Sequence, residues 1–334
     1  MGAARYIARR LIFMVPLFVG ISIVVFLMMN AAGDPIQMIV RGNPRILQHP
    51  EYIEAIRAYY GFDKPLAQQY LNWLWNFLHL NLGKSLYGGQ PVNLRVGAWT
   101  WSTIELQLIA LVLSLVISIY VGITSARKQY SKTDVAVTTT AIFGVSMPTF
   151  WLGIILIVIF SFNLGWLPSA GAFGATRIWP SLKPVEDATF LERVIDHLSH
   201  LVLPVLVLTY VNLALYVRVI RANMLEILRQ DYILAARASG LPERKVLYSH
   251  AFRNAMIPLV TLVGLYFALI LGGAPMTEFV FSWPGLGRYY IDATLVLDYP
   301  VVMGITMLIV VIALVANLVT DLAYAFVDPR VRVD

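Results

Sequence analysis

The sequence contains no cysteine, so it offers neither a disulfide framework nor a thiolate metal site. Charged residues are also scarce, at 13% of a chain that is 59% hydrophobic. This composition favours a membrane protein over a soluble one of the same length. The deciding test is whether uncharged stretches reach the roughly 20 residues that a helix needs to cross the hydrocarbon core of a bilayer.

Six uncharged and mostly apolar stretches reach that length. They are residues 11–33, 106–126, 135–162, 197–217, 254–277 and 299–320. The first follows Arg9 and Arg10, as a signal peptide would, but it is longer than the roughly 7–15 apolar residues of a signal sequence, so we expect a retained helix. The sequence therefore predicts an all-α, polytopic membrane protein with six transmembrane helices.

The spacing of these stretches predicts three parts. Residues 1–33 form an N-terminal segment with the first transmembrane helix, and residues 34–101 form a loop subdomain on the extracytoplasmic side. Residues 102–334 form a core of five transmembrane helices, which includes a cytoplasmic loop at 219–254.

The distribution of basic residues predicts the orientation. Placing both termini inside puts 15 of the 25 Lys and Arg residues on the cytoplasmic side, as the positive-inside rule requires. The net charge of +6 is thus explained by topology in a membrane of lipid, and we expect no nucleic-acid partner. The predicted location is the cytoplasmic (inner) membrane, with multiple passes and cytoplasmic N- and C-termini.

Ionisable residues are missing from the middle of every predicted span, since Glu105, Glu278 and Asp321 all lie near span ends. Ion-coupled carriers and intramembrane hydrolases need such groups at membrane depth. We therefore expect no catalytic residue, no bound metal and no self-powered transport. We expect the five histidines to be exposed or to cap helices: His49, His79, His197, His200 and His250.

The stretch "LGKS" at 82–85 superficially matches a phosphate-binding loop. Such a loop needs a glycine five positions before its Gly-Lys-Ser, so that backbone N–H groups can surround the phosphates. That position is Leu78. The stretch therefore predicts no nucleotide site, and this chain is not expected to hydrolyse ATP.

Within the spans, the remaining distinctive residues are small or polar without being charged. Most of them are expected to pack helices closely together or to interrupt them, as Gly144 and Gly153 would. A minority are candidates to line a path for a polar solute. These candidates are Ser146, Pro148, Asn212, Tyr266, Gly272 and Gly273.

A basic segment, "DYILAARASGLPERKVLYSHAFRNAMIP" at 231–258, separates the fourth and fifth spans. Ile220, Met224 and Ile227 before it have helical spacing and predict an amphipathic continuation of the fourth helix. Gly240 is suited to the left-handed residue that ends a helix, and Pro242 to the start of the next one. Small residues, a fixed turn and flanking arginines favour a docking element over a loop that merely adheres to anionic lipid.

This segment resembles the cytoplasmic signature loop of permeases from ATP-binding cassette importers, which has the pattern Glu-Ala-Ala, three residues, then Gly. Here Leu234-Ala235-Ala236 precedes Gly240, so Leu234 stands where the family has Glu, and Asp231 lies one turn earlier. The resemblance implies that the loop couples the chain to an ATPase. The implied coupling residues are Asp231, Ala235, Ala236, Gly240, Leu241 and Arg244.

Similarity to the dipeptide/oligopeptide permease subfamily extends over nearly the whole chain. It is carried by "RYIARRLIFMVPLFVGISIVVFLM", "LNLGKSLYGGQPV", "DYILAARASGLPERKVLYSHAFRNAMIPLVT" and "EFVFSWPGLGRYYIDATLVLDYPVV". The resemblance implies the type I ABC importer permease fold. It also implies a non-catalytic subunit that binds no cofactor itself, with ATP and Mg²⁺ in its partner subunits.

The partners implied by this resemblance are a second homologous permease, two cassette ATPases and an extracytoplasmic solute-binding protein. The implied activity is ATP-driven uptake of di- and oligopeptides. Oligosaccharides or nickel remain alternative solutes within the same class. From a different class, a non-transporting membrane receptor or scaffold would use the same loop to bind a cytoplasmic partner.

Overall fold

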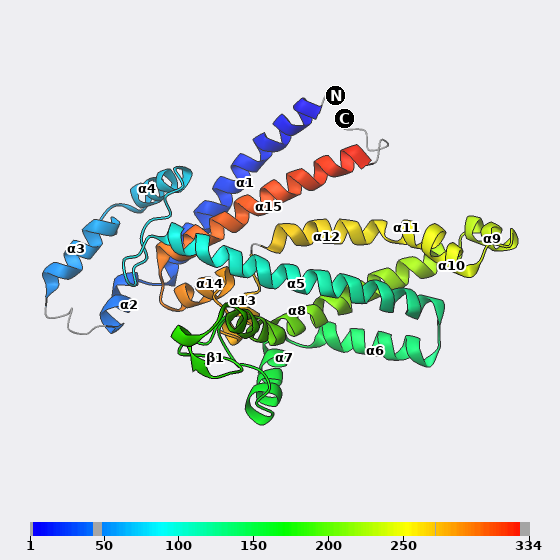
Figure 1. Ribbon diagram of the computed structural model, residues 1–334. Helices are drawn as coiled ribbons and strands as arrows, with labels where there is room; N and C mark the ends of the chain where they lie inside the picture. Colours follow the sequence, from blue (N-terminus) through cyan, green and yellow to red (C-terminus); the bar gives the residue numbers. More distant parts are fainter. Residues whose placement is uncertain (1–2, 43–48, 271, 328–334) are drawn as a thin grey trace. The chain divides into compact units, whose positions relative to one another are not determined.

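The computed structural model describes residues 3–42, 49–270 and 272–327, and these residues are mostly helical (Figure 1). The chain divides into two compact units. One contains the residues up to Trp101 together with those from Gly285 onward, and the other contains Ser102–Pro284. The long helix α5 (Val92–Arg127) begins in the first unit and ends in the second.

The first unit is built around two long apolar helices, α1 (Ala3–Ala32) and α15 (Tyr299–Val327), which pack side by side (Figure 1). The hydroxyl of Tyr299 lies within hydrogen-bonding distance of the main-chain oxygens of Met29 and Gly33 and thereby joins the two helices. Shorter helices complete the unit: α2 (Pro35–Gly42), α3 (Pro50–Tyr60), α4 (Leu66–Leu78) and α14 (Leu286–Leu295).

The core of the first unit combines apolar residues from both ends of the chain. Phe26 and Met29 of α1 belong to one buried cluster with Val302 and Met303 of α15, and Phe77 of α4 is buried in the same cluster. The aromatic side chains of α4 differ in burial. Trp73 stacks on Phe77 with ring centroids 5.7 Å apart, whereas Trp75 is 66% exposed.

The second unit is organised by α8 (Phe190–Ile227), whose first turn is closed by reciprocal hydrogen bonds between Thr189 and Glu192. Before it come α6 (Lys132–Ser146), α7 (Thr149–Leu156), the π-helical η2 (Ile157–Asn163), the short strands β1 (Arg177–Ile178) and β2 (Lys183–Pro184), and the 3₁₀ turn η3 (Val185–Asp187). After it come α9 (Asp231–Ala238), α10 (Glu243–Lys245), the π-helical η4 (Val246–Ala251), α11 (Phe252–Ala255), α12 (Ile257–Ile270) and α13 (Pro275–Val280).

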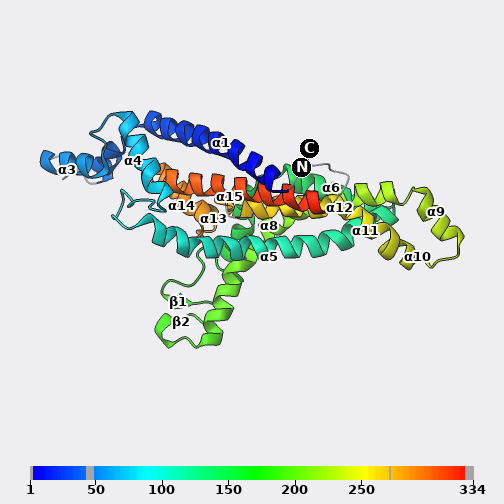
Figure 2. The ribbon, with the colours of Figure 1, turned by 90° about the horizontal axis from the view of Figure 1, so that it is seen from above.

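Close packing of α6 on α8 depends on a small residue. A side chain at Gly144 would place its Cβ 2.7 Å from the Cβ of Ala214, so the two helices approach too closely for any larger residue there. β1 and β2 pair antiparallel beside the first turns of α8 (Figure 2).

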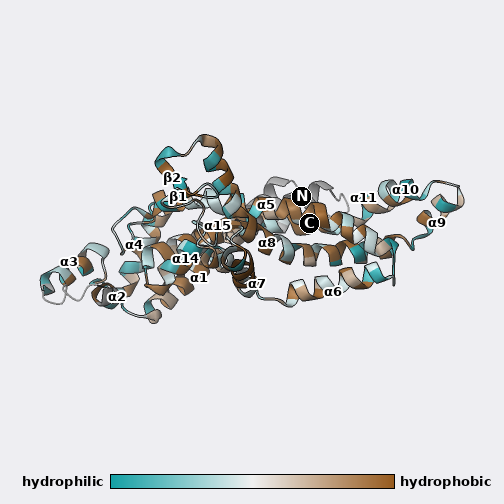
Figure 3. Cartoon of the chain, turned by 60° about the horizontal axis from the view of Figure 1, so that its bottom comes forward, coloured by the Kyte–Doolittle hydropathy of each residue, from teal (hydrophilic) through white to brown (hydrophobic). Residues whose placement is uncertain are grey.

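Four described helices are long and apolar enough to cross a membrane: Arg9–Ala32, Val92–Arg127, Phe190–Ile227 and Tyr299–Leu318. A fifth candidate is the pair Lys132–Ser146 and Thr149–Asn163, which is bent by 104°. Figure 3 shows how hydrophobic residues dominate α7, in contrast to the mixed composition of α3.

The predicted span at 135–162 is interrupted at Pro148 and is not one continuous helix. Pro148 has no N–H to continue the helical hydrogen bonds, and it disfavours helical geometry at Met147, whose ψ is 125°. The predicted span at 254–277 is also divided, into α11, α12 and the start of α13. α12 has 14 residues, about 21 Å of helix, against a hydrocarbon core of about 30 Å.

A buried ion pair fixes the first turn of α6 to α8. Asp134 is 3% exposed and accepts two hydrogen bonds from the guanidinium of Arg221, at 2.6 and 2.8 Å. Its carboxylate also accepts hydrogen bonds from Ser125 Oγ at 2.5 Å and from the main-chain N–H of Tyr130 at 2.9 Å. The carboxylate therefore joins the end of α5, the turn after it, and α8.

Replacing Asp134 with Ala is expected to lower the free energy of unfolding by about 3 kcal/mol, because it leaves the partly buried Arg221 without its counter-charge. Thermal unfolding of the purified protein in detergent measures the effect. The exposed Lys132→Ala change in the same turn should be nearly neutral, and adding Arg221→Met to Asp134→Leu should recover much of the loss. Equal stability of Asp134→Ala and the wild type would contradict this role.

Candidate functional site

The loop at residues 219–254 begins within α8 and continues beyond its end. The predicted amphipathic continuation is confirmed, since α8 extends to Ile227 and buries Ile220 and Met224 completely. These side chains pack with Ile233, Val246 and other residues of the loop in one apolar cluster. Figures 1 and 2 both show α9 and α10 at the end of the second unit, beyond α8 and α11.

The turn between α9 and α10 has the predicted left-handed glycine. Gly240 has φ +76°, its N–H donates to the carbonyl of Arg237 at 3.0 Å, and the N–H of Leu241 donates to the carbonyl of Ala236 at 3.4 Å. This pair of bonds is the Schellman arrangement, which is often accompanied by an apolar contact between the two residues of the longer-range bond, here Leu241 and Ala236. Both of these residues pack against the same apolar cluster. α10 then begins at Glu243, with Pro242 as its N-cap residue.

An ion pair closes the turn and was missed by the sequence reasoning. Arg237 donates two hydrogen bonds to the carboxylate of Glu243, at 3.1 and 2.8 Å. The Arg237 guanidinium thereby holds the pKa of the Glu243 carboxyl below its ordinary value. Opposite charges three residues before and after Gly240 were the available signal. Because both side chains are more than a third exposed, the pair is worth only about 0.2–1 kcal/mol, so it fixes geometry more than it adds stability.

The outer surface of this loop combines charge with exposed apolar groups. Among the predicted coupling residues, Asp231, Ala235, Gly240 and Arg244 are exposed, whereas Ala236 and Leu241 are half-buried against the cluster. Leu234, which occupies the position of the family's Glu, is 52% exposed, and Tyr232 and Tyr248 are similarly exposed. The loop thus exposes apolar and aromatic side chains among its charged ones.

The interior of the second unit contains a chain of uncharged polar side chains. Asn212 Nδ2 donates to the hydroxyl of Tyr266 at 3.0 Å, and that hydroxyl donates to Gln107 Oε1 at 2.7 Å. The structure therefore brings together two predicted path residues, Asn212 and Tyr266, and adds Gln107, which the sequence reasoning missed. This trio joins α8, α12 and α5.

The other predicted path residues lie at helix breaks. Ser146 and Pro148 are exposed at the bend between α6 and α7, and Gly272 and Gly273 lie in the turn before α13. Near that turn, Glu278 is fully buried and its carboxylate accepts hydrogen bonds from Thr103 Oγ1 and from the main-chain N–H of Ala274. The break before α13 therefore has a polar partner within the same unit.

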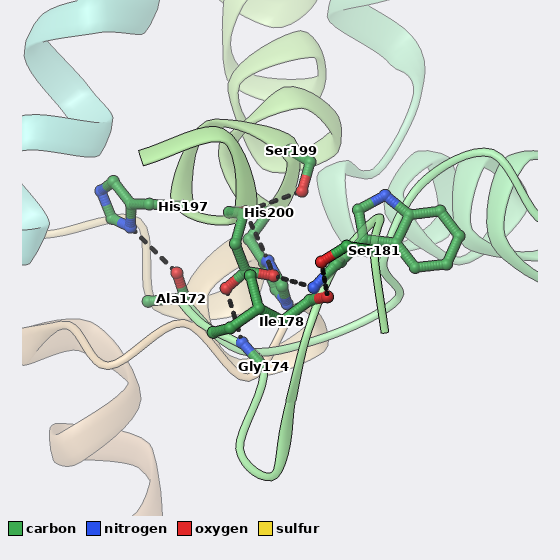
Figure 4. Close-up of polar contacts among 9 residues, drawn as sticks. Ala172, Gly174, Ile178, Ser181, His197, Ser199 and His200 are labelled. Atoms are coloured by element: carbon green, nitrogen blue, oxygen red, sulfur yellow. Dashed lines mark hydrogen bonds and ion pairs between the residues drawn. The ribbon is translucent and has the colours of Figure 1, made fainter. Parts of the chain in front are cut away.

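Two histidines at the start of α8 are not the exposed or capping residues expected. His200 is 7% exposed and lies beside Asp196, whose carboxylate accepts hydrogen bonds from the N–H groups of Gly174 and Trp179 (Figure 4). His197 bridges the carbonyl of Ala172 and the carboxylate of Glu105, at 2.9 and 2.8 Å. Together these contacts fasten the segment that carries β1 and β2 to α5 and α8.

This structure defines a class of protein: a multi-pass helical membrane protein in which a helical loop, held by hydrogen bonds and an ion pair, connects two apolar helices. The family described as "Binding-protein-dependent transport system inner membrane component" matches residues 118–333, and the model of its N-terminal region matches residues 3–87. The chain belongs to this family, the inner-membrane permease components of ATP-binding cassette importers.

Curated relatives match over almost the full length. The oligopeptide transport system permease protein AppB of Bacillus subtilis (strain 168) is 39% identical over 333 residues, which cover 98% of this chain and 99% of that protein. The dipeptide transport system permease protein DppB of Escherichia coli (strain K12) is 38% identical over 337 residues, covering 98% of both chains. The di/tripeptide permease DppB of Pseudomonas aeruginosa is 37% identical, with the same coverage.

Changing Tyr266 to Phe is expected to lower the free energy of unfolding by about 1 kcal/mol, because Asn212 and Gln107 both lose their partner. Thermal unfolding of the two purified proteins measures the difference. Tyr120→Phe is the matched control, since its side chain is 71% exposed, and it should have no effect. If both changes have equal effects, the polar trio does not stabilise the interior.

Proposed function

We propose that this chain is the permease subunit of an importer that takes up di- and oligopeptides, driven by ATP hydrolysis in separate subunits. The observation that carries the proposal is the helical loop at 219–254. It continues α8, and its turn at Gly240 is closed by the ion pair between Arg237 and Glu243. The names of relatives that match over nearly the full length support peptides as the solute.

The proposed complex contains a second homologous permease, two cassette ATPases and an extracytoplasmic solute-binding protein. ATP and Mg²⁺ bind in the ATPases, and this chain supplies no catalytic group and binds no cofactor. Both termini and the loop at 219–254 face the cytoplasm, and residues 34–101 face the opposite side. The excess of Lys and Arg in the segments assigned to the cytoplasm supports this orientation.

The mechanical role of this chain follows from how the loop is built. The Schellman bonds and the Arg237–Glu243 pair fix the angle between α9 and α10, and the apolar cluster fixes both to α8. Closure of the ATPases therefore moves the loop as a rigid lever, because its turn cannot flex without losing these contacts. The exposed Leu234, Tyr232 and Tyr248 provide the surface that the ATPase contacts.

Purification of this chain from its native membranes in mild detergent tests the composition of the complex. We expect a second multi-pass permease and one or two P-loop ATPases to co-purify, and the reconstituted complex with its binding protein to take up peptides in an ATP-dependent manner. Isolation of this chain alone under several detergents would contradict the importer proposal. Uptake of oligosaccharides or nickel instead of peptides would contradict the proposed solute alone.

Replacing Gly240 with Val is expected to uncouple ATP hydrolysis from peptide uptake without preventing membrane insertion. Apart from Gly240 and its two chain neighbours, no residue that the structure describes has a heavy atom within 4 Å of a Cβ built here, so the effect comes from the left-handed backbone and not from a clash. A β-branched residue there costs about 1–2 kcal/mol of local strain. Uptake and ATPase activity are measured on the same vesicles.

Gly240→Asn is the matched control for this substitution. Asn tolerates the left-handed region much better than Val, so this variant should retain most of the coupling. Unchanged peptide uptake per ATP hydrolysed in Gly240→Val would show that the turn geometry is not needed for coupling.

A further inference from the structure

The first unit contains a cleft of about 820 Å³ that the coupling role does not explain. It is lined by the end of α3, by one face of α4, by residues 80–84, 91 and 93, and by Pro300. Its lining has several amide side chains, three aromatic rings and one lysine, but no carboxylate. Under the proposed orientation, this cleft opens on the extracytoplasmic side.

The "LGKS" stretch supplies the lysine. Ser85 Oγ donates to the buried carboxylate of Asp298 at 2.5 Å, and the N–H of Leu86 donates to the same group at 3.2 Å. The neighbouring Lys84 pairs with Pro91 through the main chain, and its side chain lines the cleft with Nζ 5.7 Å from the ring centre of Tyr59. Within the described part of the chain, no carboxylate forms an ion pair with Lys84. A rigid loop thus holds an uncompensated cation at the wall of the cleft.

Two side-chain amides at the wall are also without partners. Asn81 and Asn93 use their side chains to hold the loop at residues 80–83, and Gln69 donates to the carbonyl of Lys64. Asn72 and Asn76, one helical turn apart on α4, make no hydrogen bond through their side chains to any residue that the structure describes. Each therefore offers one donor group and one acceptor to a ligand.

The spacing of these amides favours an extended peptide. Four residues of α-helix rise about 6 Å, and two residues of an extended chain advance about 6.6 Å. Successive backbone groups on one side of an extended peptide therefore match Asn72 and Asn76. The ring of Trp73, fixed by stacking on Phe77, and the ring of Tyr59 provide contact surface for side chains. Lys84 is the partner for a terminal carboxylate.

We infer that this cleft is a binding site for a short, extended peptide, with Lys84 holding the free C-terminal carboxylate and Asn72 and Asn76 pairing with the peptide backbone. The inference deepens the proposed function, since it places a first contact for peptide on the permease itself. Whether peptide is the transported solute is a separate question, and it is measured separately below.

The test uses the complete permease complex in lipid nanodiscs, without ATP and without the binding protein. Fluorescence anisotropy follows the binding of tetra-alanine labelled at its N-terminus, and unlabelled tetra-alanine, tetra-alanine amide and maltotetraose compete with it. The variants are Lys84→Gln and the double change Asn72→Ala with Asn76→Ala. Lys64→Gln, an exposed lysine of the same segment that does not line the cleft, is the matched control.

We expect saturable binding that is about tenfold weaker in Lys84→Gln and in the double variant, and unchanged in Lys64→Gln; this is the size of one lost charge-assisted hydrogen bond. The amide should compete about tenfold less well than the free acid in the wild type but equally well in Lys84→Gln. Absence of saturable binding, equal affinity in all variants, or equal competition by maltotetraose would each overturn the inference.

Peptide uptake by the same variants with the binding protein present separates the two proposals. Absence of saturable peptide binding by the wild-type complex in the cleft assay, with ATP-driven peptide uptake retained by that complex, overturns only the inference about the cleft. Absence of peptide uptake by the wild-type complex overturns the proposed solute, whatever the cleft binds.

Discussion

Satisfaction of main-chain hydrogen bonds in a medium without water is the constraint on which this structure depends. Within hydrocarbon each unpaired N–H or C=O costs several kcal/mol, so a helix is broken only where a partner is at hand. At the bend near Pro148, the N–H of Met147 still bonds to Phe143 and that of Leu152 to the Pro148 carbonyl, at 3.0 and 3.1 Å. At the turn before α13, the Glu278 carboxylate accepts the N–H of Ala274. The main-chain groups named at these two breaks therefore remain paired although the helix is interrupted.

The sequence was most informative where structure is decided locally. Gly240 and the apolar spacing of Ile220 and Met224 specify a helix end and an amphipathic extension, and both were confirmed. It was least informative where partners are far apart. Gln107 meets Tyr266 across 159 positions, and an uncharged residue in the uncharged stretch 106–126 gives no sign of that contact. His200 is expected to be exposed or to cap a helix, yet it is buried, because its burial depends on the fold of the segment around Asp196.

For other features the sequence identified the residues involved but not their geometry. Pro148 was recognised as an interruption, yet nothing in the sequence specified a bend of 104°. Gly144 was expected to pack helices, and the structure identifies Ala214 and Tyr210 as the residues that require it. The missing glycine correctly distinguishes the Lys84 stretch from a phosphate-binding loop. Its place beside a cleft could not be predicted, because the loop is held there by Asp298, which is far away in the sequence.

That position has a consequence for the order in which the protein is made. Ser85 and Asp298 are 213 residues apart, with most of the transmembrane chain between them. Pairing across so long a separation comes late in folding, because the intervening chain must first be ordered. During synthesis, residues 34–101 emerge early, yet the loop that bears Lys84 lacks its contact with Asp298 until the segment before the last helix has been made. An incomplete chain therefore cannot present the finished cleft, because Pro300, which lines it, and Asp298, which holds the loop beside it, are both made late.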